Sequence, residues 1–286
     1  MDFINNNESD EYGFDYCLLK YILKSSPIGK LKSVKLLFEA LALMNACPEQ
    51  YDFIDYLQTN IGNNQTIWGI KKTGDQLFTE LYFYNYNALS PQKSVKNLIA
   101  LLKQKFDCGI SISESVPCFM ISLDVNNELF KRAKLDSLHV YTNNRASGGM
   151  NGISYLFSKN AISLENFYYF FAPNTFEIDL IKEKILNSAM VDFRLVSLDE
   201  ILLPQLTNCK KICTAFKSDC EAIYYSGINI EQFLFFLNKF NYQSKIISFI
   251  EANKHLLDYL QFDVGFDYRM SADKLEIVKS GYYGVF

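Results

Sequence analysis

Tyrosine and charged side chains recur on one face of several β-like runs in this sequence. Between residues 77 and 86, Glu80, Tyr82 and Tyr84 lie at every second position, and strand side chains alternate between two faces. The same alternation predicts that one face of the later runs carries tyrosines and basic residues. These residues are His139, Tyr141, Tyr168, Lys217, Tyr225, Arg269, Lys279 and Tyr283.

This mixture of side chains suits the chemistry of an allylic diphosphate, provided that several strands turn it toward one interior. Basic side chains would hold the diphosphate through charge-assisted hydrogen bonds. Tyrosine rings would stabilise a carbocation by cation–π attraction and exclude water that would quench it. Glu80 lies beside Tyr82 and Tyr84. A carboxylate there would repel a diphosphate, so we expect Glu80 to accept a proton from the acceptor or to orient it.

Two simpler interpretations stay open. Tyrosine has a high intrinsic preference for strands, so these tyrosines could be half-buried residues that face solvent. The Glu80 carboxylate could pair with Lys71 or Lys72 across its hairpin instead of serving an acceptor. Recurrence of the same face over five hairpins favours a shared cavity. We expect that cavity to contain Tyr82, Tyr84, Tyr141, Tyr225, Lys279 and Arg269.

Five hairpins account for most of the chain, each a pair of β-rich runs joined by turn residues such as Thr73-Gly74-Asp75. The predicted pairs are 66–72 with 77–86, 118–125 with 135–143, 152–158 with 163–171, 210–217 with 220–225, and 262–269 with 275–283. Helical periodicity occurs in 14–23, 33–45, 95–106, 175–190, 198–203 and 230–253. Pro48 is expected to end the second helix and Asn241 to interrupt the last. Residues 144–151 are Gly-rich and predict a turn.

The order of these elements predicts an α+β fold, an antiparallel ten-stranded barrel surrounded by helices. A doubly wound parallel sheet needs single strands in alternation with helices, not paired strands. Closing ten antiparallel strands into a barrel removes both sheet edges, and helices can then cover the outside. We expect one domain over 1–286, with a polar arm at 1–10, a helical segment at 11–48 and hairpin and helix repeats over 50–286.

Composition excludes several classes of function. Hydrophobic residues make up 49% and the net charge is −4, so we expect a globular protein that does not bind nucleic acid. The first residues are polar and acidic, and no apolar run approaches ~20 residues, so we expect a cytoplasmic protein that does not enter a membrane. Seven cysteines without a Cys-x-x-Cys pair, and two histidines, argue against a zinc site.

Two pairs of segments resemble strands of the ABBA (αββα) barrel, the fold of aromatic prenyltransferases. Residues 264–268 (Val-Gly-Phe-Asp-Tyr) and 275–279 (Leu-Glu-Ile-Val-Lys) are similar to that family's Gly-Phe-Asp strand and its returning Val-Lys strand. Residues 121–124 and 137–141 are similar to a pair that ends in Lys-x-Tyr, with His139 in the lysine's place. The chain length is closest to the compact bacterial members and the cyanobactin-type peptide prenyltransferases.

The resemblance implies a prenyltransferase that moves a dimethylallyl or geranyl group from its diphosphate to a peptide side chain or an aromatic small molecule. It implies Glu80 as the catalytic carboxylate, and a diphosphate site with a tyrosine shield. By resemblance that site comprises His139, Tyr141, Tyr168, Tyr225, Lys279 and Tyr283. Strand alternation adds Tyr82, Tyr84, Lys217 and Arg269 to it. Mg²⁺ could accompany the diphosphate, although no motif requires it.

One strand of the family is not matched. Its Arg-x-Lys-x-Tyr pattern is replaced in the third hairpin by Asn166-Phe167-Tyr168. This departure leaves a second function open, a non-catalytic barrel that binds a small apolar or peptide ligand. A third alternative is an interaction protein in which the hairpins form an open sheet. Only the enzyme needs basic residues and tyrosines to converge inside a cavity.

Overall fold

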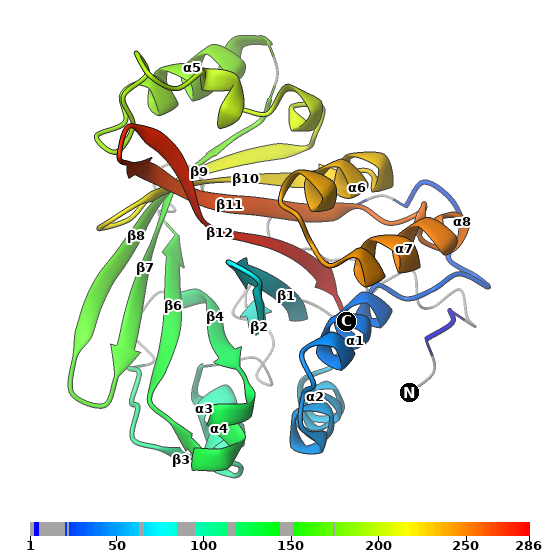
Figure 1. The fold of residues 1–286 in the computed structure, drawn as a ribbon. Helices are drawn as coiled ribbons and strands as arrows, with labels where there is room; N and C mark the ends of the chain where they lie inside the picture. The colour runs from blue at the N-terminus through cyan, green and yellow to red at the C-terminus, as the bar shows by residue number, and fades with distance from the viewer. Residues whose placement is uncertain are drawn as a thin grey trace.

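Ten antiparallel strands form a closed barrel (Figure 1). The computed structural model describes residues 3–5, 21, 23–62, 66–84, 95–113, 118–143, 151–173 and 175–286. The order around the barrel is β1-β12-β11-β10-β9-β8-β7-β6-β4-β2. These strands are β1 (Thr66–Thr73), β2 (Gln76–Tyr84), β4 (Cys118–Val125), β6 (Ser137–Asn143), β7 (Asn151–Ser158), β8 (Ile162–Phe171), β9 (Lys211–Phe216), β10 (Glu221–Ile228), β11 (Phe262–Ser271) and β12 (Lys274–Val285).

Each of the five expected hairpins is present, as antiparallel pairing of β1 with β2, β4 with β6, β7 with β8, β9 with β10 and β11 with β12. Neighbouring hairpins then pair with one another. The barrel closes where the first strand meets the last, with Ile67 of β1 opposite Val285 of β12 and Lys71 opposite Gly281. The predicted closed antiparallel barrel is therefore confirmed.

Helices lie outside the barrel and bury much of its outer face (Figure 1). They are α1 (Val34–Leu43), α2 (Pro48–Ile61), α3 (Val95–Lys103), α4 (Asn127–Arg132), α5 (Thr175–Leu186), α6 (Ile230–Lys239), α7 (Ser244–Ala252) and α8 (Lys254–Leu257). Phe233 of α6 stacks on Phe262 of β11 with ring centroids 4.3 Å apart, and Trp68 and Tyr282 are fully buried on the outer face nearby. The hydrophobic core thus lies between the barrel wall and the helices.

Some elements differ from the sequence-based expectation. Pro48 begins α2 instead of ending the preceding helix, because proline's fixed φ and missing N–H suit the first helical position. The expected polar loop of the second hairpin contains α4, capped by the Asn126 side chain. It also contributes β5 (Lys134–Leu135) to a short parallel ladder with β3 (Asp107–Cys108). The expected interruption near Asn241 is confirmed between α6 and α7.

Two expectations concern the segments 14–23 and 144–151. The first was expected to be helical, but only residues 21 and 23 of it are described, and neither is in a helix. Residues 144–150 lie outside the described residues. On the outer face of β8, α5 packs near the C-terminal end of the strand, where Lys184 Nζ lies 4.3 Å from the centroid of the Tyr169 ring. The N-terminal part of β8 is less covered. Ile162, Leu164 and Phe167 of β8 are accordingly exposed.

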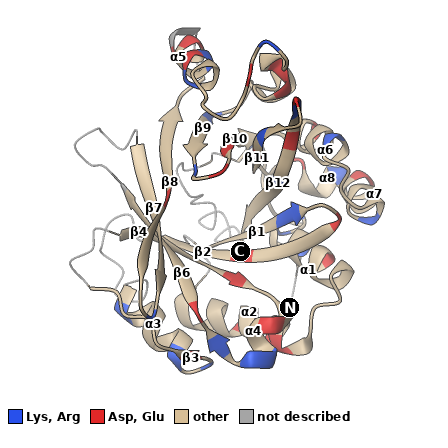
Figure 2. Ribbon diagram, turned by 60° about the vertical axis from the view of Figure 1, so that its left-hand side comes forward, with Lys and Arg blue, Asp and Glu red and all other residues tan. Residues whose placement is uncertain are grey.

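Charge is distributed evenly over the outer helices. Figure 2 shows Lys and Arg interspersed with Asp and Glu along these helices, so neither sign dominates that surface. Within the described part of the chain, no helix is both long and apolar enough to cross a membrane.

Candidate active site

Side chains from the inner faces of the ten strands leave two adjoining spaces inside the barrel. One, of about 400 Å³, is lined mainly by charged and polar side chains, and we call it the polar chamber. The other, of about 120 Å³, is lined mainly by aromatic and aliphatic side chains, and we call it the apolar chamber. Five tyrosines line both spaces, and we call them the tyrosine belt. They are Tyr82, Tyr141, Tyr168, Tyr224 and Tyr283.

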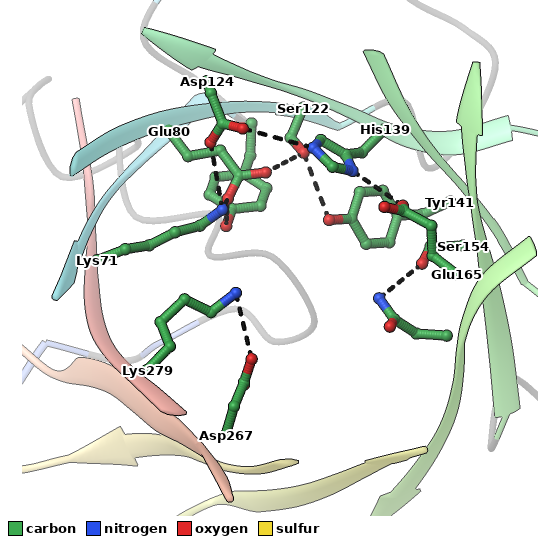
Figure 3. Close-up of polar contacts among 12 residues, drawn as sticks. Lys71, Glu80, Ser122, Asp124, His139, Tyr141, Ser154, Glu165, Asp267 and Lys279 are labelled. Carbon is green, nitrogen blue, oxygen red and sulfur yellow. Dashed lines mark hydrogen bonds and ion pairs between the residues drawn. The ribbon is translucent and has the colours of Figure 1, made fainter. Parts of the chain in front are cut away.

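The first charged group of the polar chamber joins β1, β2 and β4. The Lys71 ammonium forms an ion pair with the Glu80 carboxylate, and its Nζ also lies 3.3 Å from Asp124 Oδ1 (Figure 3). Burial disfavours both charged forms, but the opposite charges dominate: they lower the pKa of Glu80 and raise the pKa of Lys71. Both side chains are therefore ionised at neutral pH.

The second charged group joins β11 and β12 to Lys217, the residue that follows β9. Lys217 Nζ and Lys279 Nζ lie 2.6 Å and 3.2 Å from the same oxygen, Asp267 Oδ2. Burial and the charge of Lys217 lower the pKa of Lys279, and Asp267 partly opposes this effect. One carboxylate thus faces two lysines. Figure 3 shows Lys279 and Lys71 extending from neighbouring strands into the same space.

His139 of β6 supplies a further cation. Its Nδ1 lies 2.9 Å from Glu165 Oε2 and its Nε2 lies 3.7 Å from Asp124 Oδ2. Burial disfavours the imidazolium form, but hydrogen bonds to Asp124 and Glu165 raise the pKa of His139 to about 10. A bulge in the β7–β8 pairing leaves Glu165 without a partner in β7 and lets it line the chamber.

Glu80 is also hydrogen-bonded to the tyrosine belt. The Tyr82 hydroxyl donates to Glu80 Oε2 at 2.5 Å, and the Ser122 hydroxyl donates to Oε1. The Tyr141 hydroxyl lies 3.4 Å from Ser122 Oγ. Burial and the Glu80 charge raise the pKa of Tyr82 well above its ordinary value, so Tyr82 stays protonated. The Tyr82 hydroxyl therefore provides a path for a proton between the belt and Glu80.

Two glycines on the inner face make room for the belt. A Cβ atom at Gly69 would lie 2.7 Å from Tyr283 Cδ1, and a Cβ atom at Gly265 would overlap the Tyr224 ring. The Tyr82 and Tyr283 rings above Gly69 pack edge to face, with centroids 5.7 Å apart. The tyrosine belt can occupy its position only because these strands have no side chain at two points.

Aromatic rings continue from the belt around the apolar chamber. Phe119 contacts Tyr84 on one side and Tyr141 on the other, both with centroids 6.4 Å apart, and Tyr168 stacks on Phe170 at 6.3 Å. The remaining lining residues are Ile67, Met120, Cys213, Ser226, Asp263 and Val264. This chamber can take an apolar group and exclude water from it.

One group of side chains has the geometry of a metal site. Among the described residues, Glu80, Asp124 and His139 offer ligand atoms within 4.8 Å of one another. However, the Lys71 ammonium pairs with both carboxylates, and the protonated His139 supplies a second positive charge beside Asp124. Mg²⁺ also demands a near-octahedral shell of oxygen ligands, which a set with an imidazole does not supply. These residues therefore do not fit a resident Mg²⁺, and no step proposed below depends on one.

Most of the predicted site residues line the two chambers. These are Glu80, Tyr82, Tyr84, His139, Tyr141, Tyr168, Lys217, Lys279 and Tyr283. Two predictions of placement are wrong. Tyr225 points outward, where its hydroxyl donates to the Ile201 carbonyl and accepts from the Leu203 N–H, both at 2.8 Å. Arg269 pairs with Glu276 at 2.9 Å, and its side chain is 38% exposed.

The two errors have different causes. Tyr225 was placed inside because it shares a strand face with Glu221, but Glu221 is itself buried outside the barrel beside the Tyr268 hydroxyl. Tyr224 is the inward residue. Arg269 lies two positions beyond Asp267, the last β11 residue that lines the polar chamber, and so projects from the end of the barrel.

Several charged residues were missed as site residues. Lys71, Glu165, Asp219 and Asp267 line the polar chamber, and Asp124 contacts Lys71 and His139 beside it. Lys71, Asp124 and Asp267 had a usable signal, because each alternates with inward residues on its own strand, as Asp267 does with Gly265. The sequence gives no such signal for Glu165, because a bulge that regular alternation does not predict brings this residue into the chamber.

Sequence comparisons with known proteins find a distant relative at 23% identity. No family model matches the chain. A protein described as "Putative JmjC domain-containing protein L887" of Acanthamoeba polyphaga mimivirus is 23% identical over 279 residues, which cover 81% of this chain and 43% of that protein. The chain thus spans less than half the length of this curated relative.

A solved structure resembles the whole barrel. AnaPT from Neosartorya fischeri, a fungal ABBA prenyltransferase, matches with a TM-score of 0.54 at 8% sequence identity. The match covers 88% of this chain and 92% of AnaPT. With its ten-stranded closed barrel and surrounding helices, this chain has the ABBA fold of the prenyltransferases.

Proposed function

We propose that this protein is a prenyltransferase that ionises an allylic diphosphate inside the barrel and passes the prenyl group to an electron-rich acceptor. The observation that carries the proposal is the meeting of three lysines with the tyrosine belt. Lys71 and Lys279 come from the neighbouring strands β1 and β12, and Lys217 follows β9. All three line one chamber, which the five belt tyrosines close on one side.

The polar chamber would bind the diphosphate. Lys217 and Lys279 share one carboxylate, so this pair of lysines carries an excess positive charge that an anion would balance. Lys279 is the most accessible of the three lysines, with 31% of its side chain exposed against 14% for Lys71 and Lys217. A diphosphate beside Lys279 would also relieve the repulsion that lowers its pKa.

The reaction is a substitution at the allylic carbon. The bond between that carbon and the diphosphate oxygen breaks, and the diphosphate leaves with the electron pair and stays beside the lysines. The belt tyrosines stabilise the allylic cation and keep water away from it. An electron pair of the acceptor forms the new bond. The acceptor then loses one proton, which passes through the Tyr82 hydroxyl to Glu80.

The apolar chamber would hold the acceptor. An apolar cavity of roughly 150 Å³ binds one benzene molecule, and the chamber of about 120 Å³ is somewhat smaller. It suits a single inserted side chain better than a fused aromatic system. We therefore favour a peptide acceptor, as the size resemblance to cyanobactin-type enzymes implies, over an aromatic small molecule.

Calorimetry with a non-hydrolysable dimethylallyl diphosphate analogue tests the proposal. We expect binding by the unmodified protein, and a loss of roughly ten- to a hundredfold in affinity for Lys279→Ala, because a charge-assisted contact contributes about 1.5–3 kcal/mol. The fold should persist, since Asp267 keeps its shorter contact with Lys217. Arg269→Ala is the matched control, a removed cation outside the chamber, and should bind normally. Absence of binding at millimolar ligand, or equal loss in both variants, would refute the proposal.

The pairing of the lysines favours a second candidate function. Each lysine of the polar chamber already contacts a carboxylate, and Glu165 adds another negative charge. A barrel with balanced charge could bind an apolar or peptide ligand without catalysis. The same calorimetry separates the two functions, because only the enzyme must bind a diphosphate.

A further inference from the structure

Among the described residues that line the apolar chamber, one carries a carboxylate, Asp263 at the start of β11. Asp263 lies on the inner face of the strand with Gly265 and Asp267, and its side chain lines the chamber. The residue is only 6% exposed. The proposed transfer reaction does not use it, since the proton route runs through Tyr82 and Glu80.

Among the described residues, Asp263 has hydrogen-bond donors but no cationic partner. Its Oδ1 accepts from the Tyr21 hydroxyl at 2.5 Å and from the Gly227 N–H at 3.0 Å. None of the ion pairs among the described residues includes Asp263. Burial raises its pKa to about 6, against the effect of Tyr21 and Gly227. A buried carboxylate without a positive partner is costly, and a cationic ligand would remove that cost.

The walls of the chamber favour a cation independently of Asp263. Aromatic rings surround the space, from Tyr84 and Phe119 through Tyr141 and Tyr168 to Phe170. The faces of such rings attract cations, and cages of aromatic side chains are a common way to bind alkylammonium groups. Ring walls and a carboxylate that lacks a cation thus point to the same ligand chemistry.

We propose that the apolar chamber binds a small organic cation, an alkylammonium or guanidinium group, which pairs with Asp263 while its carbon atoms contact the aromatic rings. This inference rests on the proposed function in one respect, because it identifies that ligand as the part of the acceptor that enters the barrel. The acceptor would accordingly be a basic side chain of a peptide, or an amine of similar size. The bound cation has no free electron pair on its nitrogen, so it first transfers one proton to Asp263. The neutral nitrogen then forms the new bond and loses its second proton through the Tyr82 hydroxyl to Glu80.

Two probes of similar shape test the inference, tert-butylammonium and tert-butanol, titrated separately and followed by protein NMR. Both are compact enough for a chamber of about 120 Å³, and they differ mainly in charge. We expect tert-butylammonium to bind the wild-type protein at least tenfold more tightly. Equal affinities, or no binding of either probe at millimolar concentration, would overturn the inference without any variant.

The Asp263→Asn variant then tests whether the preference for the ammonium probe depends on the Asp263 carboxylate. The amide oxygen can still accept from Tyr21 and Gly227, so the fold should be retained, as a thermal melt will check. We expect the preference for the ammonium probe to fall roughly ten- to a hundredfold, as for loss of a charge-assisted contact. Asp55→Asn on the exposed face of α2 is the matched control and should keep the preference. An unchanged preference in folded Asp263→Asn would overturn the assignment to Asp263.

These outcomes do not depend on diphosphate binding. Neither probe contains phosphate, and Asp263 does not line the polar chamber. If the diphosphate analogue does not bind but the ammonium probe does, the protein is a cation-binding barrel and not a prenyltransferase. The reverse result would leave a prenyltransferase whose acceptor is neutral.

Discussion

Replacing Lys71 by Met should destabilise the protein, because it leaves a buried carboxylate without its cation. The Glu80 side chain is 2% exposed and the Lys71 side chain 14%, so solvent can replace little of the lost interaction. Removing one partner of a buried ion pair typically costs 3–5 kcal/mol. The hydroxyls of Tyr82 and Ser122 still donate to Glu80. We therefore expect the low end, about 3 kcal/mol, which corresponds to a fall in Tm of roughly 6–12 °C.

The loss of stability caused by Lys71→Met should depend on pH. In the wild-type protein the pKa of Glu80 is lowered, so its ionisation contributes stability above the unfolded-state pKa of roughly 4.3, and this is lost as pH falls through the folded-state pKa. In Lys71→Met, burial acts without the ammonium and should raise the pKa of Glu80 above that of the unfolded state. The penalty is then complete at neutral pH and shrinks as the carboxyl becomes protonated. The difference in unfolding free energy between the two proteins should narrow on acidification.

Chemical denaturation from pH 7 down to pH 4.5 measures this difference. Lys71→Met with Glu80→Gln in the same chain is the control, since a neutral amide needs no cation. The double variant should be more stable at pH 7 than Lys71→Met alone, and its loss of stability should vary little with pH. A Lys71→Met protein as stable as wild type, or a double variant with no recovery, would refute the account of this ion pair.

Two further predictions concern catalysis and packing. Glu80→Gln should reduce turnover by roughly 10²–10⁴-fold while diphosphate binding persists. The turnover is measured as diphosphate release from dimethylallyl diphosphate in the presence of a basic peptide. Near-normal turnover would mean that another group takes the proton. Gly265→Ala should cost roughly 1–3 kcal/mol by thermal or denaturant unfolding, because its methyl group overlaps the Tyr224 ring. Gly281→Ala is its control: its nearest contact is the Tyr283 hydroxyl at 3.1 Å, so a loss as large as that of Gly265→Ala would contradict the packing argument.

Hairpin turns and helical periodicity were sufficient to predict the barrel, because each hairpin is specified locally. Turn residues such as Gly74 and the alternating runs around them mark a strand pair without knowledge of the rest of the chain. Pro48 was misread because proline suits both the end of one helix and the first position of the next. Only the packing of Phe53, Ile54 and Leu57 shows that a helix follows it.

The sequence predicts which side chains of a strand face the barrel interior where polar and apolar residues alternate regularly. In β2, Glu80 and Tyr82 face the interior as the alternation indicated, and Leu81 faces the helices. In β10, Tyr224 and Tyr225 are adjacent and of the same residue type, so the sequence does not distinguish the inner Tyr224 from the outer Tyr225. The sequence also does not show how far along the barrel axis a side chain such as that of Arg269 lies, because this depends on the stagger of the strands.

The pairing of β1 with β12 constrains how this chain can be synthesised and folded. Trp68 Nε1 of β1 donates to the Val285 carbonyl at 2.9 Å, so the first and last barrel strands hold each other. Contacts between residues this far apart in sequence form slowly. Until Val285 has left the ribosome, β1 and β11 are open edges that can pair with other chains. A chain cut before β12 would therefore become an aggregating open sheet, not a smaller barrel.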